Sequence, residues 1–157
     1  MLEAAMTLLD AQKYDFAKQR RQRIMLVVGI VVLLAVLVIG WTNRYWREKR
    51  IGGQFFAALQ KKDYETAYGI YFADADWKQH QQNHSQYPYS DFFRDWGPGG
   101  DWGVIQTYEV YGASNCPGSG RGVVVDVIVN HRAEHAQVWV ESGTHAISLP
   151  PCALEFR

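Results

Sequence analysis

The sequence has few of the residues and motifs that carry redox or nucleotide chemistry. It contains two cysteines, which lie far apart, and it has no Walker loop, no G-x-S-x-G elbow and no dinucleotide fingerprint. A C-x-x-C pair and a haem-attachment motif are absent as well. We therefore expect no bound cofactor.

An excess of positive charge is also missing, because Lys and Arg number 16 and Asp and Glu number 16. The charges are nevertheless separated along the chain. Residues 1–50 carry nine basic and four acidic side chains, whereas residues 51–157 carry seven and twelve. A nucleic-acid-binding domain needs a basic patch of its own, so the acidic second part argues against nucleic acid as a partner.

One long apolar run is present. Residues 24–39 contain no polar side chain, and thirteen of them are Ile, Leu or Val. A helix over residues 24–41 would be roughly 27 Å long, close to the thickness of a bilayer's hydrocarbon core. A cleaved signal peptide has a shorter apolar region that ends in small residues. We therefore predict a transmembrane helix over residues 24–42.

The residues after this run are typical of a membrane–water interface. Aromatic rings favour headgroup depth and basic side chains favour lipid phosphates. We expect five residues to lie at this level: Trp41, Arg44, Tyr45, Trp46 and Arg47. Gly52-Gly53 is expected to break the helix and to end a basic and aromatic linker over residues 43–53.

The orientation in the membrane rests on two observations. Five basic residues precede the apolar run and four follow it, which barely decides a positive-inside vote. Cys116 and Cys152 each lie beside a proline, and such a pair suits a disulfide formed in an oxidising compartment. We therefore predict an inner-membrane protein with a helical cytoplasmic tail over residues 1–23 and a periplasmic domain over residues 54–157. The alternative is a cytosolic domain with two reduced cysteines.

Three short helices are predicted at the start of the domain. The first covers residues 54–62, the second begins after an N-cap at Asp63, and the third begins at a cap on Ser90 or Asp91. The polar stretch over residues 74–89 is predicted to be loop or frayed helix. The apolar side chains of the three helices are expected to turn inward: Phe55, Phe56, Leu59, Tyr64, Ala67, Tyr68, Tyr71, Phe92, Phe93 and Trp96.

The hydrophobic pattern then changes to a period of two, which is typical of strands. We predict strands over residues 104–112, 122–131 and 136–141, with a further strand over residues 144–149. The helices come first and the strands afterwards, without βαβ alternation. The prediction is an α+β domain whose short helices pack on a curved, mainly antiparallel sheet.

The phrase Phe55-Phe56-x-Ala58-Leu59-x-x-x-Asp63-Tyr64-x-x-Ala67-Tyr68 resembles the opening of nuclear-transport-factor-2-like cone domains. The likeness covers about residues 54–149, and it implies a cone closed by the helices. Some members similar to this chain combine a short cytoplasmic tail, one anchor helix and an extracytoplasmic cone, as in the scaffold component of type IV secretion systems. The chain departs from the family's Trp-x-[Ile/Val] ending.

Enzymes of this fold class use an Asp base inside the cone, and the resemblance makes Asp126 a weak catalytic candidate. Asp126 interrupts the apolar segment over residues 123–129. With a period of two it shares a face with Val124 and Ile128, where a paired or edge-exposed carboxylate is the stronger interpretation. We therefore favour a domain without catalytic activity.

The histidines suggest a metal site that their setting does not support. His80/His84 and His131/His135 form two H-x-x-x-H pairs, and on a helix such a pair can share a metal. The first pair lies in a polar stretch without a third ligand, and the second spans the predicted turn. We expect surface histidines and no metal.

Seventeen Phe, Trp and Tyr residues in residues 51–157 exceed what a small core requires. Five of them lie in or beside loops and are candidates for partner contacts: Trp77, Tyr87, Tyr89, Trp96 and Trp102. Alternatively, they close the open end of the cone.

The hypothesis is a noncatalytic accessory or scaffold subunit of a secretion, respiratory or photosynthetic membrane complex. Its partners would be other integral membrane subunits and the lipid bilayer. The alternative is a membrane-tethered enzyme or small-ligand carrier that uses a cone-shaped cavity around Asp126.

Overall fold

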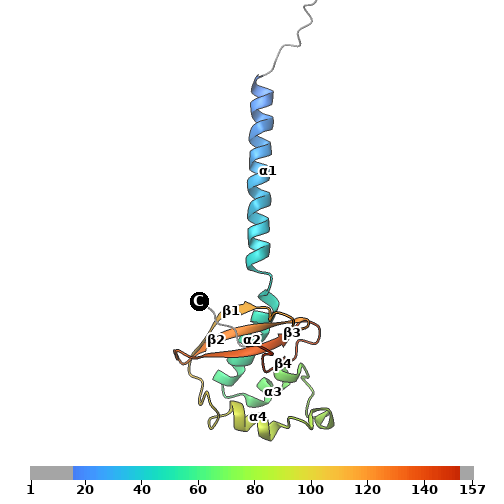
Figure 1. The fold of residues 1–157 in the computed structure, drawn as a ribbon, viewed down its shortest axis with the longest axis vertical. Helices are drawn as coiled ribbons and strands as arrows, with labels where there is room; N and C mark the ends of the chain where they lie inside the picture. The colour runs from blue at the N-terminus through green and yellow to red at the C-terminus, as the bar shows by residue number, and fades with distance from the viewer. Residues whose placement is uncertain (1–15, 153–157) are drawn as a thin grey trace, which may run out of the picture. The chain divides into compact units, whose positions relative to one another are not determined.

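The computed structural model describes residues 16–152 and has the predicted α+β architecture (Figure 1). An N-terminal apolar helix is followed by short helices and an open, four-stranded antiparallel sheet. The chain divides into two units, with the boundary after Asn43. The fold class predicted from the order of helical and alternating segments is therefore confirmed.

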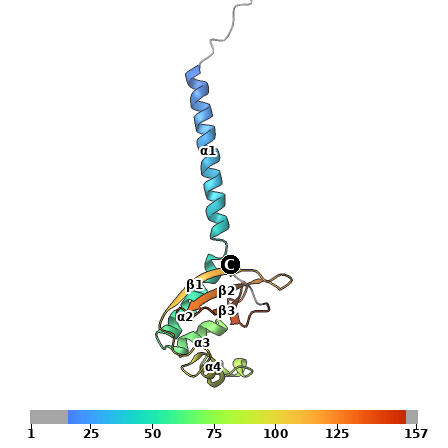
Figure 2. The same cartoon turned by 60° about the vertical axis from the view of Figure 1, so that its left-hand side comes forward.

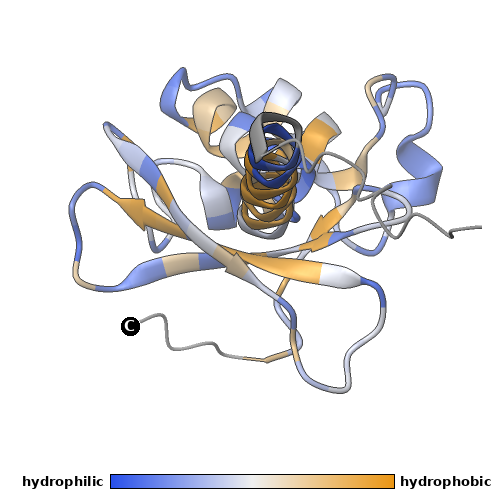
Figure 3. Ribbon diagram, turned by 90° about the horizontal axis from the view of Figure 1, so that it is seen from above, coloured by the Kyte–Doolittle hydropathy of each residue, from blue (hydrophilic) through white to orange (hydrophobic). Residues whose placement is uncertain are grey.

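The first unit consists of helix α1, Phe16–Thr42. Among the described residues, the large apolar side chains from Ile24 to Ile39 are 48–63% exposed. In Figure 3, which is coloured by hydropathy, this stretch of α1 is orange. Within residues 16–152, one helix is long and apolar enough to cross a membrane, and this is its apolar segment. The predicted helical tail falls largely on residues 1–15, outside the described range.

Helix α1 ends at Thr42, ten residues before the predicted break at Gly52-Gly53. The side chains of Thr42 and Asn43 both donate to the carbonyl of Ile39, satisfying an acceptor at the end of α1. Helix α2, Trp46–Gln60, then runs without interruption through Gly52-Gly53, so the prediction of a break at the two glycines is wrong.

The reason lies in the packing of α2 on the sheet. A Cβ atom on Gly52 would lie 2.9 Å from Cγ1 of Val125, so the absence of a side chain lets the helix approach the strand closely. Phe55, Phe56 and Leu59 are then buried against the sheet.

Helix α3, Tyr64–Phe72, begins as predicted, with Oδ1 of Asp63 accepting from the amide of Thr66 at 3.1 Å. After the short 3-10 helix η1, Gln81–His84, comes α4, Tyr89–Trp96. Its N-cap is Pro88, so the prediction of a cap at Ser90 or Asp91 is wrong.

Phe92 of α4 is fully buried, whereas the adjacent Phe93 is 42% exposed and packs edge-on against Tyr64. The expectation that both rings turn inward is therefore wrong for Phe93, because neighbouring helical residues point about 100° apart.

The sheet has the order β1-β2-β3-β4, with every neighbouring pair antiparallel. Its strands are β1 Tyr108–Ser114, β2 Gly122–Val129, β3 His135–Glu141 and β4 Ile147–Ser148. The sheet is thus a simple meander whose last strand is two residues long. Figures 1 and 2 both show α3 and α4 on one side of it.

Strand β1 starts four residues later than predicted because Asn130 organises the chain before it as a loop. Oδ1 of Asn130 accepts from the amides of Gln106 and Thr107, and its Nδ2 donates to the carbonyl of Val104. These backbone groups are therefore satisfied by one side chain rather than by a strand partner.

Strand β2 has buried residues on both faces. Val125, Val127 and Val129 belong to the main core together with the aromatic residues of α2, α3 and α4. Because side chains alternate across a strand, Val124 and Asp126 lie on the opposite face of the sheet. This alternation decides where the candidate site residues point.

Candidate functional site

Residues 41–50 combine exposed aromatic rings with basic side chains. Trp41 is 72% and Trp46 is 58% exposed, unusually high values for tryptophan. The Arg44 guanidinium lies 4.3 Å above the Tyr45 ring, and that of Arg50 lies 5.3 Å from the Trp46 ring. Such cation–π pairs hold a guanidinium group and an aromatic ring next to each other.

We call Arg44, Arg47, Lys49 and Arg50 the basic collar. Its one acidic neighbour, Glu48, accepts a hydrogen bond of 3.2 Å from Ser142, in the turn after β3. The first turn of α2 is thus tied to the sheet, and the predicted interface residues from Arg44 to Arg47 belong to the second unit.

The five aromatic candidates for partner contacts lie largely in the interior. Trp77 is buried and donates its ring N–H to the carbonyl of Glu65 at 3.1 Å. It stacks on Tyr89, with ring centroids 5.2 Å apart. The other three pack, half-buried, against the main core: Tyr87, Trp96 and Trp102. Such positions suit the alternative interpretation, in which these rings close the end of the domain.

A hollow of about 420 Å³ remains beside these rings. Tyr71, Tyr87, Trp96 and Trp102 line it together with carboxylates such as Asp95. The Tyr87 hydroxyl donates to Asp95 at 3.0 Å. Burial and the neighbouring Asp95 carboxylate raise the pKa of Tyr71 and Tyr87, so both phenols stay protonated at neutral pH.

Asp126 is fully buried in the second of the four strands, so it is paired rather than exposed at an edge. Its Oδ2 lies 2.5 Å from Nδ1 of His135, and its Oδ1 accepts from Nε2 of Gln137 at 3.2 Å. The Tyr111 ring packs edge-on against His135 at 5.3 Å. A carboxylate that holds Nδ1 of a histidine occurs in hydrolytic triads, and it is equally the way a buried carboxylate finds donors.

The face of the sheet on which Asp126 lies bears on whether the Asp126–His135 pair is catalytic or structural. Asp126 lies on the face of β2 opposite Val125, which packs against α2. Asp126 itself does not line the hollow beside the aromatic rings, although its partner Gln137 does. His135 and Gln137 together satisfy the hydrogen-bonding groups of this buried carboxyl.

The first histidine pair shares a carboxylate. Oδ2 of Asp74 lies 3.0 Å from Nδ1 of His80 and 3.0 Å from Nε2 of His84. The hydrogen bond with His84 is the main cause that lowers the pKa of Asp74. The sequence does not indicate this partner, because Asp74 follows α3 at six and ten residues from the two histidines. Across residues 16–152, no three His, Cys, Asp or Glu residues form a group suited to a metal ion.

The second histidine pair is separated by the turn between β2 and β3. His131 lies in that turn with a positive φ, whereas His135 is the first residue of β3. His145 lies in the turn before β4. These three residues do not meet at one site.

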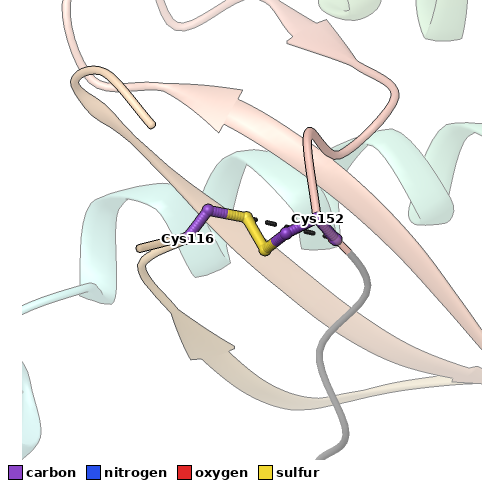
Figure 4. Close-up of a disulfide and its surroundings, with 2 residues drawn as sticks. All are labelled: Cys116 and Cys152. Atoms are coloured by element: carbon purple, nitrogen blue, oxygen red, sulfur yellow. Dashed lines mark hydrogen bonds between the residues drawn. A yellow bond between two sulfur atoms is a disulfide. The ribbon is translucent and has the colours of Figure 1, made fainter. Parts of the chain in front are cut away.

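Cys116 and Cys152 form a disulfide across 36 residues of sequence, with their Cα atoms 5.9 Å apart (Figure 4). Cys116 lies in the loop after β1 and is buried. Cys152 is the last described residue. The bond ties the end of the chain to the body of the domain.

Comparison with known proteins adds no relative to this description. No protein-family model, no curated protein and no solved structure matches the chain. The function must therefore be inferred from the residues and their geometry.

Proposed function

We propose that this chain is a single-pass inner-membrane protein that serves as a noncatalytic accessory or scaffold subunit of a multi-protein membrane complex. The observation that carries the proposal is α1, whose apolar side chains are exposed on all sides. A helix that is hydrophobic all round needs either a protein core or lipid around it. None of the residues 16–152 forms a core around α1, so lipid and neighbouring transmembrane helices would be its natural surroundings.

The disulfide supports the proposed orientation. A bond between Cys116 and Cys152 persists in an oxidising compartment such as the periplasm and is rare in the cytosol. The N-terminus would then be cytoplasmic, in agreement with the slight excess of basic residues before the apolar run.

Two features favour a scaffold over an enzyme. Asp126 lies away from the helical side of the sheet, so the proposed cone would lack the base that related enzymes use. The rings of Trp77, Tyr89 and Phe92 pack against one another and fill that side instead. We also propose that the domain is a nuclear-transport-factor-2-like cone, on the basis of its opening helices and antiparallel meander.

The test is purification of the full chain with a C-terminal tag from native membranes in mild detergent, followed by mass spectrometry. We expect stoichiometric integral membrane proteins that are absent when another tagged single-pass protein is purified in parallel. The intact mass must include residues 24–42, since cleavage there would mean a signal sequence. Recovery of the chain alone would contradict the scaffold role.

The hollow beside Trp96 favours a second candidate, a tethered small-ligand carrier. Its aromatic walls would suit an organic cation, which would have to compete with Arg94 for the Asp95 carboxylate. Native mass spectrometry of the same preparation distinguishes the two functions. A bound small molecule without protein partners would favour the carrier.

A further inference from the structure

The basic collar is a strongly basic stretch in a unit that is otherwise acidic. Residues 44–50 carry four basic side chains against one acidic side chain, Glu48, which is engaged by Ser142. Residues 51–157 carry seven basic and twelve acidic side chains. Positive charge is thus concentrated at the start of α2, and the rest of this unit is acidic.

The chain itself holds the collar close to the end of α1. Arg44 is two residues beyond Thr42, at most roughly 7 Å away, and Arg47 follows within the first turn of α2. The headgroup region adds roughly 5–8 Å to each side of the hydrocarbon core. If α1 spans a bilayer, Arg44 lies at headgroup depth, and Arg47, five residues beyond Thr42, is at most roughly 18 Å from the end of α1.

The collar is also pre-organised. Ile51, directly after Arg50, packs against the domain core, and Glu48 is bonded to the sheet. Arg47 and Arg50 are three residues apart on α2 and therefore share a face. Less backbone freedom therefore remains to be lost on binding than in a flexible basic tail.

We infer that Arg44, Arg47, Lys49 and Arg50 form a binding site for the phosphate groups of anionic phospholipids. This inference rests on the proposed membrane anchoring of α1. Guanidinium groups bind phosphate oxygens through paired hydrogen bonds, and the exposed rings of Trp41 and Trp46 have the amphipathic character that favours the same depth. The acidic remainder of the unit is repelled by the same lipids.

The test uses the full chain reconstituted in phosphatidylcholine vesicles that contain a trace of spin-labelled phosphatidylglycerol or spin-labelled phosphatidylcholine. The motionally restricted component of the electron paramagnetic resonance spectrum measures how strongly each lipid associates with the protein. We expect association of phosphatidylglycerol to exceed that of phosphatidylcholine by on the order of fivefold. The preference should fall strongly in 1 M NaCl, where charges are screened.

The variant R44Q/R47Q/K49Q/R50Q should lose most of this preference, and R44K/R47K/R50K should retain it. Two matched controls separate the collar from other basic residues. K61Q/K62Q changes two exposed lysines after the other end of α2, and R20Q/R21Q/R23Q changes the flank before the apolar run. The first should behave like the wild type, and the second should keep the part that the collar contributes.

An unchanged preference in R44Q/R47Q/K49Q/R50Q would overturn the lipid site while leaving the anchor intact. Failure of the wild-type chain to float with the vesicles would overturn both the anchor and the site.

Discussion

Asp126 is fully buried, and two neighbouring side chains form hydrogen bonds with its carboxyl group. The sequence marks it because it interrupts an apolar strand, yet its partners His135 and Gln137 come from the register of β2 against β3. A register shift of one residue would turn these side chains to the other face. The sequence therefore predicts that Asp126 is exceptional, but it cannot predict the partners.

Replacing His135 with Ala should lower the free energy of unfolding by about 2–4 kcal/mol, because it removes one of two donors from a buried carboxylate. Chemical denaturation measures the change. Glu134→Ala, at an exposed position in the preceding turn, is the matched control and should change stability by less than about 0.5 kcal/mol. Equal stability of the two variants would mean that the Asp126–His135 pair does not support the fold.

Asp74 gives a dependence on pH. Hydrogen bonds from His84 and His80 lower its pKa below the ordinary value of 3.8. The folded state therefore binds this proton less readily than the unfolded state, and the stabilisation is fully present above the ordinary pKa. It should be lost as the pH falls through the lowered pKa.

Thermal unfolding of the wild type and Asp74→Asn between pH 6 and pH 2 tests this sign. The wild type should be more stable than the variant at pH 6, and the difference should shrink below about pH 4. A difference that is constant over this range would contradict the role of the Asp74 carboxylate.

Among the secondary-structure elements, α2 shows most clearly how tertiary packing overrides local preference. Two adjacent glycines are poor helix formers, yet they lie in the middle of α2 because Gly52 faces Val125 at close range. Gly53 has the nearest Val110 atom 3.6 Å from its ideal Cβ position, an ordinary contact.

Gly52→Ala should therefore destabilise the domain by about 1–3 kcal/mol through overpacking, despite the better helix propensity of Ala. Gly53→Ala is the matched control and should be neutral or stabilising by up to about 1 kcal/mol. Both values come from denaturant unfolding. Stabilisation by Gly52→Ala would show that α2 and β2 are not packed as closely as described.

Elements whose formation depends on local pattern were predictable. The apolar run gives α1, and the Asp63 cap and the following period give α3. The predictions fail where a contact between residues far apart in the sequence determines the local structure. Gly52 packs against Val125, and Asn130 holds residues 104–107 in a loop. The site residues follow the same rule, since the partners of Asp74 and Asp126 depend on a turn and a strand register.

At the scale of the whole molecule, the disulfide links stability to compartment. The bond joins Cys116 and Cys152, which are 36 positions apart in the sequence, and closes the chain between them into a loop. By loop-closure entropy it should stabilise the domain by about 3–4 kcal/mol. Unfolding of the full chain with and without a thiol reductant measures the effect, and C116A/C152A should match the reduced wild type.

Unchanged stability on reduction would contradict this prediction. It would also weaken the argument for an oxidising compartment, since that argument depends on a disulfide that matters to the fold.

We propose that α1 crosses the membrane once and that the domain lies on the extracytoplasmic side. A pair of fusions placed after Arg157, one to alkaline phosphatase and one to green fluorescent protein, tests this topology when the full chain is expressed in a bacterial host. We expect an active phosphatase, which needs its own disulfides, and a dark fluorescent protein. An inactive phosphatase together with a bright fluorescent protein would place the domain in the cytoplasm and overturn the proposed topology.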